Sequence, residues 1–196
     1  MNLLASCWDT VGWAHFRKGE TSAALRYLSA AWDLAQDGAV ADHIGQVYER
    51  SGKRDRAIEY YALAAAVPGA KPGGRERLVA LVGEATARAQ IDEQRQRLGI
   101  LRAYDVPRAL GEGTAEFFVA LAPGSKAVEV RFASGDEKLK SLASSLKSIR
   151  FNMNFPDEGD ARVFRRGILT CQAATKSAKG SCAFILLKTE DVHSVD

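Results

Sequence analysis

The residues able to do chemistry are few and scattered along this chain. The histidines His15, His43 and His193 share no metal-ligand spacing with a carboxylate or with one another. The sequence also contains no nucleophile elbow, no phosphate-binding loop and no dinucleotide glycine fingerprint. We therefore predict that the protein is not an enzyme and that it holds no metal and no cofactor.

The three cysteines are too few for a disulfide scaffold. Cys171 and Cys182 fall near the facing ends of two predicted strands, so we expect a disulfide between them if the protein is exported. A pair of reduced, half-buried thiols is the alternative.

Leu4-Ala5-Ser6-Cys7 has the letters of a lipoprotein cleavage site, but the apolar stretch before it is too short. Cys7 is therefore expected to be buried on a first helix.

Charge and hydropathy exclude further classes. The formal charge is only +3, from 27 basic and 24 acidic residues spread along the chain, which does not suggest nucleic-acid binding. No apolar run is long enough to span a bilayer, although peripheral association with a cell envelope stays open. One group of basic residues lies in the second half of the sequence, at Arg131, Arg150, Arg162, Arg165 and Arg166. We expect these arginines either to lie on a solvated sheet face or to contact an anionic partner.

The first third of the chain repeats itself at a constant interval of 33 residues, for example 57 minus 24. The equivalent positions are Val11-Gly12 and Ile44-Gly45, Gly19 and Gly52, Ala24 and Ala57, Leu25 and Ile58, Leu28 and Tyr61, Ala31 and Ala64. Small residues at such positions let two antiparallel helices approach closely, and the glycines after the first helix supply the left-handed backbone that ends it. Each segment therefore predicts a helical hairpin.

These segments resemble the tetratricopeptide repeat, with units at about 5–37 and 38–70 and a capping helix at about 75–96, preceded by a hinge at Gly73-Gly74. The repeat is one residue shorter than is usual in that family, and His15 stands where an aromatic residue is expected. The resemblance implies a concave surface, formed by the first helix of each unit, that binds a protein or peptide. Here that surface would carry Asp9, Trp13, Phe16, Arg17, Asp42, Gln46, Glu49 and Arg50.

After residue 98 the hydrophobic pattern changes from helical to alternating. Strands are predicted at 114–122 and 127–133, at 161–172 and 181–188, and at an edge segment at 100–106. Between the two strand pairs, Ser134-Gly135-Asp136-Glu137 reads as a capping box that begins a helix with one apolar stripe. The predicted fold class is therefore α+β, with helical repeats in 1–97 and a hairpin, helix and hairpin in 98–196.

Residues 116–156, which end in Phe151-Asn152-Met153-Asn154-Phe155-Pro156, resemble the carboxyl-terminal domain of TonB-type proteins. That resemblance implies binding of a partner strand to a sheet edge. Together the two resemblances predict a protein-interaction scaffold, the carboxyl-terminal part of a larger bacterial envelope protein, with a periplasmic location suspected. The alternative is a regulatory or accessory tail of an enzyme whose catalytic part lies upstream.

Overall fold

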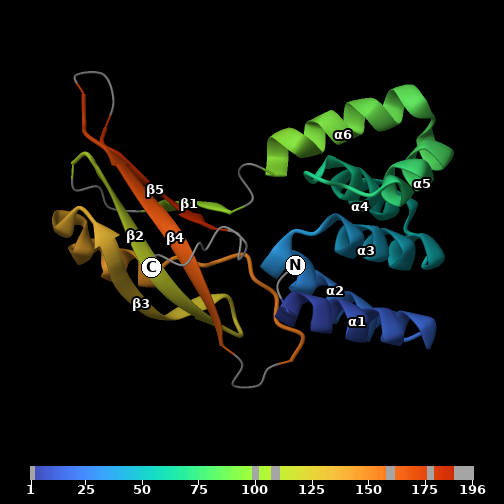
Figure 1. Ribbon diagram of the computed structural model, residues 1–196, viewed down its shortest axis with the longest axis horizontal. Helices are drawn as coiled ribbons and strands as arrows, with labels where there is room; N and C mark the ends of the chain where they lie inside the picture. The colour runs from blue at the N-terminus through green and yellow to red at the C-terminus, as the bar shows by residue number, and fades with distance from the viewer. Residues whose placement is uncertain (1–2, 99–101, 107–110, 158–161, 176–178, 188–196) are drawn as a thin grey trace. The chain divides into compact units, whose positions relative to one another are not determined.

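The computed structural model describes residues 3–98, 102–106, 111–157, 162–175 and 179–187. The chain divides into two compact units, Met1–Leu101 and Arg102–Asp196. Helices make up the first unit, and a five-stranded antiparallel sheet with short helical segments makes up the second (Figure 1). The mixed α+β class predicted from the sequence is confirmed.

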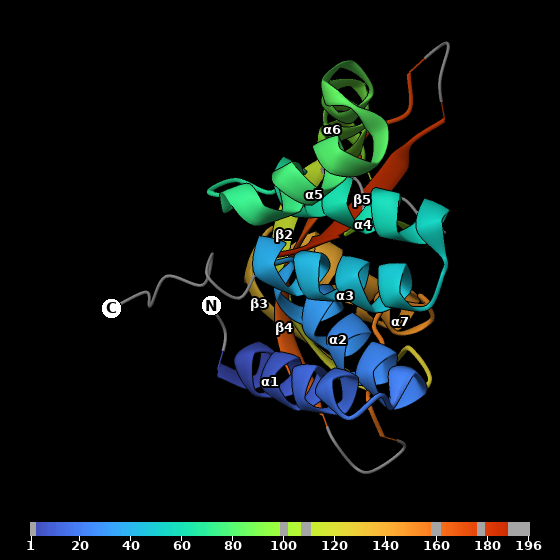
Figure 2. The same cartoon turned by 90° about the vertical axis from the view of Figure 1, so that its right-hand side faces the viewer.

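The helical unit is a series of neighbouring helices joined by short turns. Their bounds are α1 Leu3–Arg17, α2 Thr21–Ala35, α3 Gly38–Arg50, α4 Arg54–Ala66, α5 Pro72–Val82 and α6 Glu84–Leu98. Within the first two pairs, α1 packs on α2 and α3 packs on α4 (Figure 2). Each pair also contacts the next one, because α2 packs on α3 and α4 packs on α5. The first, third and fifth helices therefore follow one another along the unit.

In each of the first two helix pairs, a glycine allows the two helices to pack closely against each other. A Cβ at Gly12 would lie 2.7 Å from Leu28 Cγ, and a Cβ at Gly45 would lie 2.5 Å from Tyr61 Cε1. At the ends of α1 and α3, Gly19 and Gly52 have φ angles of +83° and +73°, which L residues with side chains rarely adopt. The same residue type thus performs the same task at positions 33 apart.

The single capping helix predicted at 75–96 is wrong. Two helices occupy that range, because Gly83 leaves the helical backbone with a φ of +81° and a ψ of 162°. The hinge predicted at Gly73-Gly74 is also wrong, since both glycines lie in the first turn of α5, which Pro72 begins. A Cβ at Gly74 would lie 2.7 Å from Ala64 Cβ, so this glycine allows α5 to approach α4.

In the second unit all strand pairs are antiparallel and the order is β1-β5-β4-β2-β3. The bounds are β1 Ala103–Val106, β2 Gly113–Ala122, β3 Lys126–Gly135, β4 Val163–Gln172 and β5 Ser181–Leu186. One sheet face is buried, and there the Phe184 ring contacts Phe117 and Phe151 edge to face. A Cβ at Gly167 would lie 2.3 Å from Phe184 Cζ, so this glycine makes room for the ring.

The helix predicted after the capping box is only partly correct. A 3-10 helix, η1 Glu137–Leu142, precedes the short α7 Ala143–Lys147, and no side chain caps either segment. The Asp136 carboxylate instead accepts a hydrogen bond at 2.8 Å from the Thr114 backbone N–H, which diverts it from the helix start. The apolar stripe is confirmed, because Leu139, Leu142 and Leu146 are fully buried.

Candidate partner-binding face

Two residues of α1 meet one residue of α3 at the centre of the predicted surface. His43 Nδ1 lies 2.8 Å from Asp9 Oδ1, and its ring stacks on that of Trp13 with centroids 4.2 Å apart. Trp13 also contacts Phe16, with centroids 4.8 Å apart. A hydrogen bond and a stacked ring together hold the imidazole in one orientation, so α1 and α3 present these side chains as a unit.

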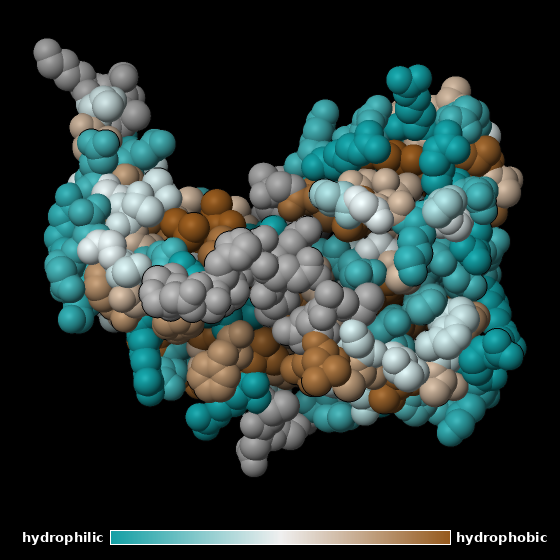
Figure 3. Space-filling model, in the orientation of Figure 1, coloured by the Kyte–Doolittle hydropathy of each residue, from teal (hydrophilic) through white to brown (hydrophobic). Residues whose placement is uncertain are grey.

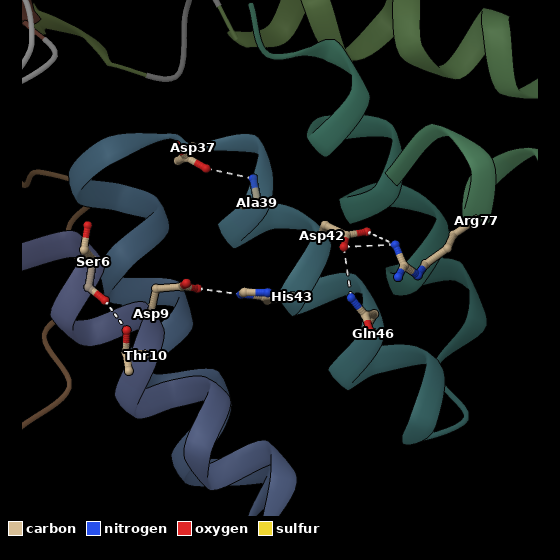
Figure 4. A network of polar contacts seen from close by, with 9 residues as sticks. All are labelled: Ser6, Asp9, Thr10, Asp37, Ala39, Asp42, His43, Gln46 and Arg77. Carbon is tan, nitrogen blue, oxygen red and sulfur yellow. Dashed lines mark hydrogen bonds and ion pairs between the residues drawn. The ribbon is translucent and has the colours of Figure 1, made fainter. Parts of the chain in front are cut away.

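The next contact along the surface joins α3 to α5. Asp42 Oδ1 and Oδ2 accept hydrogen bonds from Arg77 Nη1 at 2.9 and 3.0 Å, and Gln46 Nε2 donates to Asp42 Oδ2 at 2.9 Å. Figure 4 shows Arg77 reaching from α5 toward Asp42, and Asp9 and His43 facing each other across α1 and α3. Asp42 is 17% exposed, and this partial burial strengthens the pairing relative to a fully solvated ion pair.

At the carboxyl ends of α1 and α3 the contacts are different. The Arg50 guanidinium lies over the Phe16 ring, 5.3 Å from its centroid. The Tyr61 hydroxyl donates a hydrogen bond of 2.5 Å to Glu49. Burial is the main cause that raises the pKa of Tyr61, and the hydrogen bond to Glu49 raises it further. The phenol therefore stays a neutral donor at physiological pH.

The structure thus connects most of the predicted surface residues through short contacts. Arg17 is the exception, because it is exposed and no described residue makes an ion pair with it. The sequence reasoning did not select His43, which contacts α1, or Arg77, which binds Asp42 from α5. His43 could have been selected from the sequence because it lies beside Asp42 on the same helix. No sequence pattern selects Arg77, because the position 33 residues after Asp42 is Arg75.

The cysteines divide into a bonded pair and a single thiol. Cys171 and Cys182 are directly opposed on β4 and β5 and form a disulfide. Cys7 was expected to be buried, and that expectation is wrong: its side chain is exposed on α1. The reason is that the inner face of α1 is filled by other residues, Ala5, Trp8, Gly12 and Phe16.

The grouped arginines do not form one basic patch. Arg166 Nη2 lies 2.6 Å from both carboxylate oxygens of Glu116, and its hydrogen bonding lowers the pKa of that carboxyl. Arg131 pairs with Glu129, and the buried Arg165 donates to the Leu187 carbonyl at 2.7 Å. The charges of Arg166 and Arg131 are therefore neutralised within the sheet unit, and the side chain of Arg165 is buried in the protein.

Within the described residues, no group of histidine, cysteine, aspartate and glutamate side chains could hold a metal ion. None of the described helices is both long and apolar enough to cross a membrane.

Comparison with known proteins gives no family. No protein-family model, no curated protein and no solved structure matches this chain. The assignment of a function therefore depends on the contacts described above.

Proposed function

We propose that this protein is a protein-interaction module that binds a peptide segment of a partner on the face of α1, α3 and α5. The observation that carries the proposal is a pair of contacts made by neighbouring residues of α3: His43 contacts Asp9 and Trp13 of α1, and Asp42 binds Arg77 of α5. These contacts align hydrogen-bonding and aromatic groups across the three helices. In this reading the helix pairs act as tetratricopeptide-type units.

Fixed side chains favour this role on energetic grounds. A rotamer-rich side chain that is immobilised on binding costs about 0.5 to 1.5 kcal/mol. Trp13, His43 and Asp42 are already held by neighbours, so a ligand would not need to order them. Arg17 and Arg50 are exposed beside them and remain available to a partner's polar groups.

Selection from a displayed library of random peptides tests this proposal. Peptides enriched on the intact protein should bind at least about tenfold more weakly to the Trp13→Ala and Arg17→Ala double variant, a loss of about 1.4 kcal/mol or more. Arg26→Ala, which removes an exposed arginine on α2, is the matched control and should bind normally. Equal binding of selected peptides by the double variant would exclude this face.

For the sheet unit, the TonB-type resemblance motivates a second contact surface. β3 lies at one edge of the sheet and has ten residues, whereas β1 at the other edge has four. On the sheet face over β4, β2 and β3, a hollow of about 320 Å³ is lined by Phe118, Ala120, Glu129, Arg131 and Phe164. A partner strand that added to β3 could place a side chain in this hollow. Hydrogen exchange should then slow in β3 when a partner binds, and unchanged exchange there would exclude strand addition.

The Cys171–Cys182 disulfide favours an oxidising compartment, such as the periplasm suspected from the sequence. Protein purified without reductant should show one alkylatable thiol under denaturing conditions, and three after reduction. Three thiols in both samples would remove this argument for export.

A further inference from the structure

The outer side of α1 carries an uncovered apolar stripe, which we define as Leu4, Cys7, Val11 and Ala14. All of these residues are exposed, with Leu4 at 38% and Val11 at 39%, and the adjacent Leu3 is 81% exposed. In Figure 3, several hydrophobic residues lie among polar ones at the lower edge of the helical unit, where α1 lies. The steps of three, four and three residues are those of a seam between two helices.

The internal repeat shows how unusual this exposure is. The positions 33 residues after Cys7, Val11 and Ala14 are Val40, Ile44 and Val47 of α3. Each of these α3 residues has no exposed surface, in a helix that packs on α2 of the preceding pair. The α1 stripe is therefore the same stacking surface, apolar in both helices but covered only in α3.

The opposite end of the helical unit offers no complement to the α1 stripe. The exposed residues of α6 are mainly polar and charged, among them Arg88, Asp92, Glu93, Arg95 and Gln96. Hydrophilic residues accordingly cover the outer side of α6 in Figure 3. Head-to-tail stacking of copies would bury these charges against apolar side chains, which is unfavourable. A two-fold symmetric contact, in which the same surface faces itself, avoids that cost.

We propose that the α1 stripe is a dimer interface, in which α1 packs antiparallel on α1 of a second copy. In the register where paired positions sum to 18, Leu4 lies opposite Ala14 and Val11 lies opposite Cys7 of the other copy. Each large side chain then meets a small one, which lets the two stripes interdigitate. The stripe contains no charge, so no like charges face each other across it.

Polar groups beside the stripe do not oppose this packing. The Thr10 hydroxyl donates to the Ser6 carbonyl at 2.8 Å, so it already has a partner within its own helix. Antiparallel helices also place opposite ends of their dipoles together. A contact made by one helix per copy is smaller than the roughly 800 Å² per partner of a standard interface, so we expect a weak dimer that dissociates on dilution.

Sedimentation velocity of the intact protein over a range of concentrations tests the proposal. The unmodified protein should show a monomer–dimer equilibrium. Val11→Lys should raise the dissociation constant by roughly a hundredfold, because a symmetric dimer carries the buried charge twice. Val128→Lys is the matched control, since Val128 on β3 is 38% exposed against 39% for Val11, and it should dimerise normally. A protein that stays monomeric at all concentrations, or a dimer that Val11→Lys leaves intact, would overturn the proposal.

Cross-linking tests the register independently. Val11→Cys introduces a thiol that the antiparallel pairing places opposite Cys7 of the other copy, while Cys171 and Cys182 are already bonded. Mild oxidation should convert most of this variant to a covalent dimer that reductant separates, whereas Val128→Cys should stay mainly monomeric. If the two variants cross-link to the same extent, the proposed register is wrong. The circular dichroism of each variant shows whether it has folded.

Discussion

The helical and sheet units are stabilised by contacts of different range along the chain. In the helical unit each helix packs on the next one or two helices, and the same glycine position recurs at Gly12 and Gly45. In the sheet unit, β1 pairs with β5 and β2 pairs with β4, so strands distant in sequence are neighbours. The comparison indicates that close packing at a few small residues stabilises the first unit, and long-range pairing with a disulfide stabilises the second.

The largest effect is expected from filling the closest helix contact. In Gly45→Val the new side chain would collide with the Tyr61 ring, which is fully buried and held by Glu49. We expect a loss of about 3 kcal/mol in the free energy of unfolding of the helical unit. Tryptophan fluorescence during urea unfolding measures it, because Trp8, Trp13 and Trp32 all lie in that unit. The matched variant Ala89→Val, on the exposed side of α6, should change stability by less than about 0.5 kcal/mol.

Removal of the disulfide should affect only the other unit. With a sequence separation of 11, Cys171→Ala with Cys182→Ala should destabilise the sheet unit by about 2 kcal/mol. Hydrogen exchange of β4 and β5 should accelerate, while tryptophan fluorescence should report unchanged unfolding of the helical unit. A parallel loss of stability in both units would contradict their independence.

A smaller effect is expected for the α3–α5 contact. Asp42→Ala removes the acceptor for Arg77 and Gln46, so the helical unit should lose about 1 to 2 kcal/mol. Asp92→Ala, which breaks the exposed Asp92–Arg95 pair on α6, should cost less than about 0.5 kcal/mol. Urea unfolding of the two variants compares them, and equal losses would mean that partial burial of Asp42 adds nothing.

The smallest effect is a pH dependence confined to the sheet unit. Hydrogen bonding from Arg166 holds the pKa of Glu116 below its usual 4.5. The carboxylate therefore stabilises the folded state above about pH 5, and this contribution is lost as the pH falls through the lowered pKa. We expect less than about 1 kcal/mol, and a flatter acid profile of hydrogen exchange in β2 and β4 for Glu116→Gln. An unchanged profile would show that the pair contributes nothing.

The sequence predicted features whose causes are local. The small residues at Gly12, Gly45 and Ala57 mark helix contacts, and alternation marks β2 and β3. It did not predict the break at Gly83, because an isolated glycine is tolerated within a helix and only its backbone angles end one. Nor could it reveal that Thr114, 22 residues earlier in the chain, takes the carboxylate of Asp136 away from the helix start.

The residues of the candidate surface also fall into two classes, those that the sequence predicted and those that only the structure shows. Asp9, Trp13, Asp42 and Gln46 were implied by the tetratricopeptide resemblance, which assigns the concave surface to the first helix of each unit. Arg77 lies outside that register, and its contact with Asp42 depends on how α5 enters the helical unit after Pro72. Long side chains that reach across helices are set by such packing, so their partners emerge only from the structure.

The proposed binding face is tested most directly by the indole N–H signals of the three tryptophans, recorded as a selected peptide is added. Trp13 lies on that face, whereas Trp8 and Trp32 are buried elsewhere in the helical unit. We expect the Trp13 signal to shift together with backbone amides of α1, α3 and α5, while the signal of Trp32 stays in place. Shifts confined to the sheet unit or to the α1 stripe, with Trp13 unmoved, would contradict the proposed binding face.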